Sequence, residues 1–294
     1  MLRRTRFIAV ATMAAVVSSI TLIASAAVVP ADVDLEGADA LWDAVNGYDY
    51  GTSGAPCTAS TGGFSGAEGG EYDGMTDAFD GGLYLLIDGV VFNDGDGDGT
   101  YSAGKQQLTV GPTKLSRLQI SRTERALQGT PTLRTLVKLV NPTNRDRTVT
   151  ATWDSALGAD DDERTRASSA PKNRRTTPDD DWIVTSDSAT SPSDPVLTFV
   201  VYGPGDIDVT NRTVPWAPED ADPASGSNSG CVVFRFRARA PAGQTRYLMF
   251  FTEMRATNEK AIQTAPRFEN VRPASPLLDG ISGRVADRIL NWDL

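Results

Sequence analysis

The chain has 294 residues, with 38 acidic and 28 basic side chains, a formal net charge of −10 and no histidine. Such an acidic protein repels nucleic-acid phosphates, so nucleic acid is not expected as a partner. Without histidine, Ser-His-Asp and Cys-His catalysis and histidine-bound zinc are excluded, and an enzyme would have to use carboxylates, Tyr, Lys or Arg.

Residues 1–26 have the pattern of a secretory signal peptide. Three arginines form a basic start, residues 7–23 are mostly apolar, and Ala24-Ser25-Ala26 supplies a small-residue cleavage site. An N-terminal membrane anchor is the alternative, because the apolar stretch is near the length of a spanning helix. Cleavage would remove three arginines and no acid, changing the net charge from −10 to −13. We therefore expect a secreted or cell-surface protein that is free of the membrane after cleavage.

Residues 27–81 are rich in Gly, Ser, Thr and Asp. A short helix is predicted over 38–45, because its apolar residues fall on one helical face. The many glycines of 51–74 predict loop or extended chain. We expect 27–81 to be an N-terminal segment packed on a main domain that spans 82–294.

The main domain shows the period-two alternation of half-buried strands. Strands are predicted over 83–92, 107–111, 116–127, 132–141, 147–155, 182–187, 196–203, 206–214, 231–239 and 245–254. Two polar stretches between them, 156–181 and 215–230, are expected to be loops. The fold class is therefore all-β, a large antiparallel β-sandwich.

Short helices are expected at the C-terminal end. A helix should begin after Thr257 or Asn258, either of which can act as its N-cap. Apolar residues between 278 and 292 recur every three or four positions, which predicts a helical stripe that covers an edge or an open end of the sheets.

Strand 231–239 has two different faces. Val232, Phe234 and Phe236 should face the core, whereas Arg235 and Arg237 should face water. Arginines on an exposed sheet face can bind acidic sugars. The more ordinary role is pairing with neighbouring acids.

The two cysteines that remain after cleavage, Cys57 and Cys231, are expected to form a disulfide, because exported proteins fold in an oxidising compartment. Two unrelated thiols are the alternative. A disulfide closing so long a loop would stabilise the fold by about 5 kcal/mol in the loop-entropy model.

The stretch at 92–106 is a candidate calcium site. Asp94, Asp96 and Asp98 alternate with glycines as in the first half of an EF-hand loop, but Lys105 stands where that loop needs a bidentate Glu. An irregular calcium site remains possible, because a divalent cation would relieve the repulsion between three carboxylates. A hairpin between strands 83–92 and 107–111 explains the Asp-Gly pairs without metal. No cofactor is otherwise required.

Two further sets of residues are candidates for a site. Asp154 and Glu253 lie at predicted strand ends, where a carboxylate pair for glycoside hydrolysis could form. Trp216 lies in a Pro-rich stretch, where an exposed indole could stack on a sugar ring, although a tryptophan that anchors its own loop is the ordinary explanation.

The sequence of residues 115–162 resembles that of uncharacterised exported bacterial β-sandwich proteins of the supersandwich, galactose-mutarotase-like type. The matching features are a strand ending in Ser-Arg, a following strand ending in Asn141-Pro142-Thr143, and the sequence TVTATWDSALG at 148–158. The resemblance implies a large sandwich of a kind often seen in carbohydrate-related proteins. Mutarotase activity does not carry over, because its acid-base histidines have no counterpart here.

The sequence therefore favours a secreted or envelope-associated, non-catalytic β-sandwich protein with a binding or structural role, whose partner would be a polysaccharide or a cell-envelope component. The alternative is a carbohydrate-active enzyme that uses a carboxylate pair. Whether the protein is an enzyme stays undecided at this level.

Overall fold

The computed structural model describes residues 27–30, 32–46, 57–58, 63–67, 69–93, 98–158, 162–170, 174–218 and 230–294. The predicted signal peptide, residues 1–26, lies outside these ranges. In the described part of the chain, no helix is long and apolar enough to cross a membrane.

The fold is an all-β antiparallel sandwich, as predicted, and its larger sheet has nine described strands. Their order is β1-β8-β9-β10-β11-β18-β15-β14-β13. Their bounds are Ala27–Pro30 (β1), Asp98–Ser102 (β8), Gln107–Leu115 (β9), Leu118–Ala126 (β10), Thr132–Val140 (β11), Thr245–Arg255 (β18), Val196–Val200 (β15), Trp182–Ser186 (β14) and Arg164–Ser168 (β13).

A five-stranded sheet packs on the inner face of the larger one. Its order is β16-β17-β12-β6-β7. The bounds are Thr210–Trp216 (β16), Cys231–Ala240 (β17), Arg147–Ala156 (β12), Tyr84–Ile87 (β6) and Val90–Val91 (β7).

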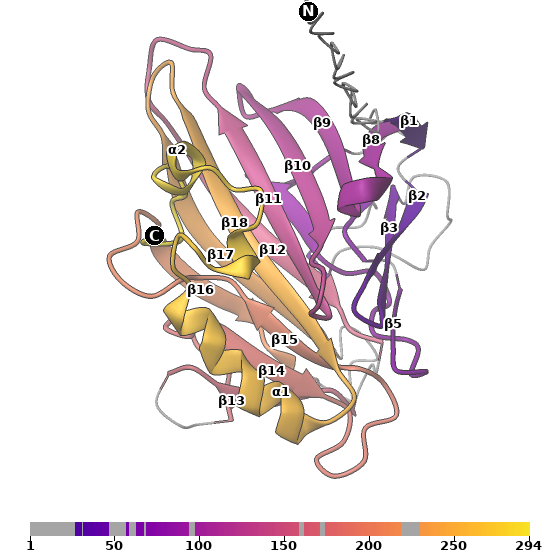
Figure 1. The fold of residues 1–294 in the computed structure, drawn as a ribbon. Helices are drawn as coiled ribbons and strands as arrows, with labels where there is room; N and C mark the ends of the chain where they lie inside the picture. Colours follow the sequence, from indigo (N-terminus) through magenta and orange to yellow (C-terminus); the bar gives the residue numbers. More distant parts are fainter. Residues whose placement is uncertain are drawn as a thin grey trace, which may run out of the picture.

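The glycine-rich N-terminal segment adds a small third sheet. It consists of β2, β3, β4 and β5, with both β4 and β5 pairing with β3. In Figure 1 this sheet lies at the right-hand side of the molecule. The bounds are Asp32–Gly37 (β2), Ala40–Asn46 (β3), Phe64–Ser65 (β4) and Gly70–Tyr72 (β5).

The core between the two large sheets comes from the alternation that the sequence showed. On β17 the even-numbered residues are buried, including Phe234 and Phe236, while the odd-numbered arginines are exposed. Trp153 of β12 stacks on Phe250 of β18, with ring centroids 4.2 Å apart and ring planes inclined by 9°. This contact joins the two sheets directly.

An ion pair lies inside this apolar core. Arg122 and Glu124 of β10 are fully buried and bonded to each other, and the hydroxyl of Thr135 also donates to Glu124. The Arg122 guanidinium lies over the rings of Trp153, at 4.8 Å from the centroid, and Phe64, at 5.0 Å. Burial raises the pKa of Glu124 and lowers that of Arg122, in each case against the attraction of the partner.

The C-terminal segment covers the outer face of the nine-stranded sheet. It contains α1 (Asn258–Thr264), η4 (Ala265–Asn270), η5 (Pro276–Leu278) and α2 (Gly283–Ala286). Figure 1 shows α1 lying in front of this sheet. The predicted cap is confirmed, because the Thr257 side chain accepts a hydrogen bond from the Lys260 backbone N–H. The predicted stripe at 278–292 is helical only over the four residues of α2.

The predicted helix over 38–45 is wrong, because this segment forms the β2–β3 hairpin. Its turn residues, Ala38 and Asp39, both have positive φ, at 43° and 66°, which suits a two-residue hairpin turn. Alternate residues of β3 are buried, including Trp42. Apolar residues at this short spacing fit a strand as well as a helix.

Two stretches for which no strand was specified contain strands, one predicted as a loop (156–181) and one as loop or extended chain (51–74). The polar stretch 156–181 includes β13, whose hydrogen bonds to β14 place it at the edge of the nine-stranded sheet. The stretch 51–74 includes β4 and β5. These strands are short or lie at a sheet edge, so they lack the apolar alternation that marks half-buried strands.

Candidate functional site

The outer face of the five-stranded sheet is a regular grid of arginine and threonine side chains. Arg235, Arg237 and Arg239 of β17 are all exposed on this face. Their partners on β12 are Thr152, Thr150 and Thr148 in that order. On the other side of β17, Thr210 and Thr213 of β16 pair with Arg237 and Arg235. We call this surface of Arg235, Arg237, Arg239 and the five threonines the arginine face.

The arginines of this face are mostly not neutralised by acids. Arg239 forms an ion pair with Asp146, and Arg235 Nε donates to Thr152 Oγ1 over 3.4 Å. The side chain of Arg237 makes no hydrogen bond or ion pair with any described residue. Among the described residues no ion pair joins Arg235 or Arg237 to an acid, but the charge of Arg235 acts on the buried carboxylate of Asp154 and opposes the rise in its pKa that burial causes.

A hollow of about 490 Å³ opens at one end of the arginine face. Arg237 and Arg239 line it from β17 and Arg246 lines it from β18, so both large sheets contribute. Like that of Arg237, the side chain of Arg246 has no hydrogen bond or ion pair to a described residue. The remaining lining comes from Thr148, Asp208, Thr210, Pro241 and Leu290. Below we call this the arginine hollow.

A second hollow, of about 420 Å³, lies farther along the same face. Its lining includes Arg235, Thr150 and Thr152, together with Asp88 and Gly89 of the β6–β7 turn. Asp88 is already bonded, because its carboxylate accepts from the Thr150 backbone N–H at 2.7 Å and the Ser116 hydroxyl at 2.5 Å. Unlike the arginine hollow, this one has no excess of positive charge.

Trp216, predicted as a ligand residue, is the last residue of β16 and is half-buried. It pairs with Val233 of β17, which shares the face of Arg235. The structure thus places Trp216 on the sheet face that carries the arginines.

Asp154 closes the end of this face. Asp154 lies on β12, opposite Val233 of β17, and is fully buried. Its carboxylate accepts from the backbone N–H groups of Cys57 and Thr58, at 2.9 and 3.0 Å, and from the Thr58 hydroxyl at 2.5 Å. Burial raises the pKa of Asp154, and these hydrogen bonds oppose that shift. The carboxylate therefore anchors the covering segment.

The disulfide predicted between Cys57 and Cys231 is present and fixes this same segment. Cys231 is the first residue of β17 and pairs with Ala156 of β12. The covalent link and the Asp154 hydrogen bonds thus hold one short piece of chain over the sheet.

Glu253 lies on the opposite side of the sandwich and is also fully engaged. It is buried on the outer face of β18, beneath the C-terminal segment. Its carboxylate accepts from Arg255 Nε at 2.6 Å, from the Thr264 hydroxyl at 2.7 Å and from the Thr132 hydroxyl at 3.1 Å, and it pairs with Arg267. Glu253 therefore joins strands β11 and β18 to α1 and η4.

The acidic stretch does not form the hairpin predicted for it. Strand β7, which precedes it, belongs to the five-stranded sheet, whereas β8 and β9 belong to the nine-stranded sheet, so the stretch connects two sheets. Asp98 is the first residue of β8. Asp94 and Asp96 lie outside the described residues, and calcium binding remains a prediction. Among the residues that the structure does describe, no three acidic or cysteine side chains form a metal-binding group.

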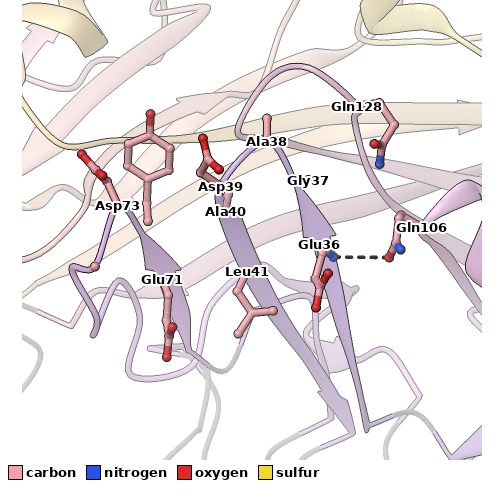
Figure 2. Close-up of a pocket in the computed structure, with 12 residues that line it drawn as sticks. Glu36, Gly37, Ala38, Asp39, Ala40, Leu41, Glu71, Asp73, Gln106 and Gln128 are labelled. Carbon is pink, nitrogen blue, oxygen red and sulfur yellow. Dashed lines mark hydrogen bonds between the residues drawn. The ribbon is translucent and has the colours of Figure 1, made fainter.

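A third hollow, of about 510 Å³, lies beside the β2–β3 hairpin. Figure 2 shows Glu36 and Glu71 on either side of Leu41, the three residues forming one row across β2, β3 and β5. The turn residues Asp39 and Asp73 add two more carboxylates, while Gln106, just before β9, and Gln128, just after β10, line the opposite side. This hollow is acidic, and no basic residue lines it.

The buried carboxyl group of Glu163, outside these hollows, also has a raised pKa. Burial raises the pKa of Glu163 to about 8, and the nearby carboxylates of Asp187 and Asp194 add to the shift while Arg166 opposes it. Groups of this kind often occur at functional sites, but Glu163 lines none of the three hollows. Its clearest consequence is for stability.

The sequence pattern identified two of the arginines but not the hollow. Arg246 was missed because it comes from another strand, and its approach to β17 depends on how the sheets pack. The threonines of β12 could have been recognised, because Thr148, Thr150 and Thr152 alternate with the core residues Val149 and Ala151.

No family model matches this chain, and no curated protein does. Among solved structures, it is similar to a protein from Klebsiella pneumoniae subsp. pneumoniae that is described provisionally as an aldose 1-epimerase, with 12% sequence identity. The alignment covers 74% of this chain and 64% of that one, with a TM-score of 0.27. No activity is inferred from so low a likeness, and membership of the galactose-mutarotase-like type remains an expectation.

Proposed function

We propose that this chain is a non-catalytic protein that acts outside the cell and binds polysaccharide along the arginine face. The observation that carries the proposal is the set of three exposed arginines and five threonines, of which Thr152 is buried, on β17, β12 and β16, with a hollow toward each end. Each hollow falls within the size range of small-ligand sites.

The chemistry of the face suits a chain of sugars. Sugar hydroxyls need both donors and acceptors, which guanidinium groups and threonine hydroxyls supply together. The grid runs along adjacent strands, so it offers an extended surface rather than a single deep pocket. Trp216 adds an indole on the same face, next to Val233.

The alternative, a carbohydrate-active enzyme with a carboxylate pair, is not favoured. Asp154 and Glu253 lie on opposite outer faces of the sandwich, and each already accepts several hydrogen bonds. A glycosidase pair has to flank one bond at about 5–10 Å separation. The positions of these two residues therefore favour a protein that binds polysaccharide over one that cleaves it with this carboxylate pair.

A steric block tests the proposal. Both cysteines of the chain are in the disulfide, so Thr213→Cys introduces the one free thiol and places it on the exposed edge of the face. The purified chain, labelled there with a maleimide-polyethylene glycol, is screened against soluble polysaccharides by affinity electrophoresis. Ser282→Cys, exposed on the far side beside α2, is the matched control.

We expect the unlabelled chain and the labelled Ser282→Cys chain to be retarded by at least one polysaccharide, and the labelled Thr213→Cys chain to migrate freely. If no polysaccharide retards the unlabelled chain, or if both labelled chains bind equally, the proposal is wrong.

A further inference from the structure

We infer that the polysaccharide is acidic and that the arginine hollow is the subsite for one sugar carboxylate. This inference rests on the proposed function and adds the charge of the ligand and the residues that select it.

The first step is the unbalanced charge of the arginine hollow. Arg239 is already paired with Asp146, which leaves Arg237 and Arg246 as cations without a partner among the described residues. Asp208 is the one acid in the lining, and it forms no ion pair with either arginine. The lining therefore carries an excess of one positive charge, in a chain whose net charge is −10.

The second step is the kind of anion that this excess fits. A single positive charge is balanced by a monoanion rather than by a phosphate dianion. Guanidinium groups bind carboxylates through two parallel hydrogen bonds, and the hydroxyls of Thr148 and Thr210 can complete the contacts. A carboxylate of a uronic acid unit meets both requirements.

The third step concerns the neighbouring units of the ligand. The second hollow has Arg235 as its one arginine, and that arginine already bonds to Thr152, while Asp88 supplies a negative charge. It is therefore balanced, and it suits a neutral part of a sugar. Because one hollow binds an anion strongly and its neighbour is neutral, we expect the carboxylate bound in the arginine hollow to determine which polysaccharides bind.

The test compares two polymers with the same backbone. Polygalacturonate carries a carboxylate on each unit, and its methyl ester carries none. The dissociation constant of the purified chain for each polymer is measured by calorimetry at low and at physiological salt. The variants are Arg237→Gln and Arg246→Gln, and Arg284→Gln of α2 is the matched control, because Arg284 is exposed and has no partner among the described residues.

We expect polygalacturonate to bind, its methyl ester to bind at least about tenfold more weakly, and added salt to weaken binding. Arg237→Gln and Arg246→Gln should each weaken polygalacturonate binding by about tenfold or more, since each loses a charge-assisted hydrogen bond. Arg284→Gln should leave it unchanged.

Two outcomes overturn the inference. If the methyl ester, or a neutral polysaccharide alone, binds and that binding is blocked by the label at Thr213→Cys but unchanged in Arg237→Gln and Arg246→Gln, the ligand is not acidic while the proposed function stands. If no polysaccharide binds, the proposed function fails and the inference fails with it.

Discussion

Asp154 and Glu253 lie on opposite outer faces of the sandwich, with the stacked rings of Trp153 and Phe250 between the two sheets that carry them. Both carboxylates are buried, and each fixes a separate piece of covering chain. Asp154 holds the segment at Cys57 on the five-stranded sheet, whereas Glu253 holds the C-terminal segment on the nine-stranded sheet. Each of the two acids therefore holds a covering segment on its own sheet.

Asp154→Asn should therefore lower stability without abolishing polysaccharide binding. Its amide cannot accept all three hydrogen bonds as the carboxylate does, and an unsatisfied buried donor costs about 1–3 kcal/mol. Urea unfolding would measure the loss, and affinity electrophoresis would show that binding is kept. A stable variant that has lost binding would instead place Asp154 in a ligand site.

The buried pair of Arg122 and Glu124 can be tested by comparing a single substitution with a double one. Arg122→Met leaves Glu124 buried without its cation and should destabilise the protein by about 3–5 kcal/mol. Arg122→Met with Glu124→Leu should recover most of that loss, because replacing both charges by apolar groups is often nearly neutral. The free energies of unfolding of the two variants decide the question. Equal losses in both would mean that the pair itself is not what stabilises this part of the core.

The carboxyl group of Glu163 makes stability depend on pH. Its pKa of about 8 in the folded chain lies above the ordinary value of 4.5, so the folded protein binds this proton more tightly than the unfolded one. The contribution is fully favourable below about pH 4.5 and is lost as pH rises toward 8. Glu163→Gln, which stays neutral, should be more stable than the parent at pH 8 by on the order of 3–5 kcal/mol.

Thermal unfolding of Glu163→Gln and the parent across pH 4 to about 9 checks this prediction. Glu71→Gln is a suitable control, because Glu71 is exposed on β5. Parallel pH profiles for Glu163→Gln and the parent would show that Glu163 does not carry a proton in the folded chain.

Removing the disulfide should destabilise the fold. Cys57→Ser with Cys231→Ser opens a loop of 174 residues and should lower the free energy of unfolding by about 3–5 kcal/mol. Reductant should destabilise the parent by a similar amount and leave the double variant unchanged. If reductant has no effect on the parent, the bond contributes little to its stability.

Much of the sandwich could be predicted from local pattern. The buried and exposed faces of β17 and β12 follow from strict alternation, and Thr257 caps α1 as its position suggested. The prediction of a helix over 38–45 was wrong because the chain reverses at Ala38 and Asp39. Neither is a glycine, the residue that usually marks such a hairpin turn in a sequence.

The candidate site was only partly predictable. Arg235 and Arg237 share a face by alternation alone, which any strand assignment reveals. Arg246 joins that region only because the two sheets pack against each other, and Trp216 only because β16 pairs with β17. Such long-range contacts have no signature in local sequence. The connection of β7 to β8 across two sheets was missed for the same reason.

The central claim, that an acidic polysaccharide lies on the arginine face, is tested most directly by chemical protection of arginines. The purified chain is treated with phenylglyoxal, with and without oligogalacturonate, and the modified residues are located by mass spectrometry. The structure predicts that the ligand protects Arg237 and Arg246, while Arg284 reacts equally in both samples. Equal modification of Arg237 and Arg246 with and without the ligand would contradict it.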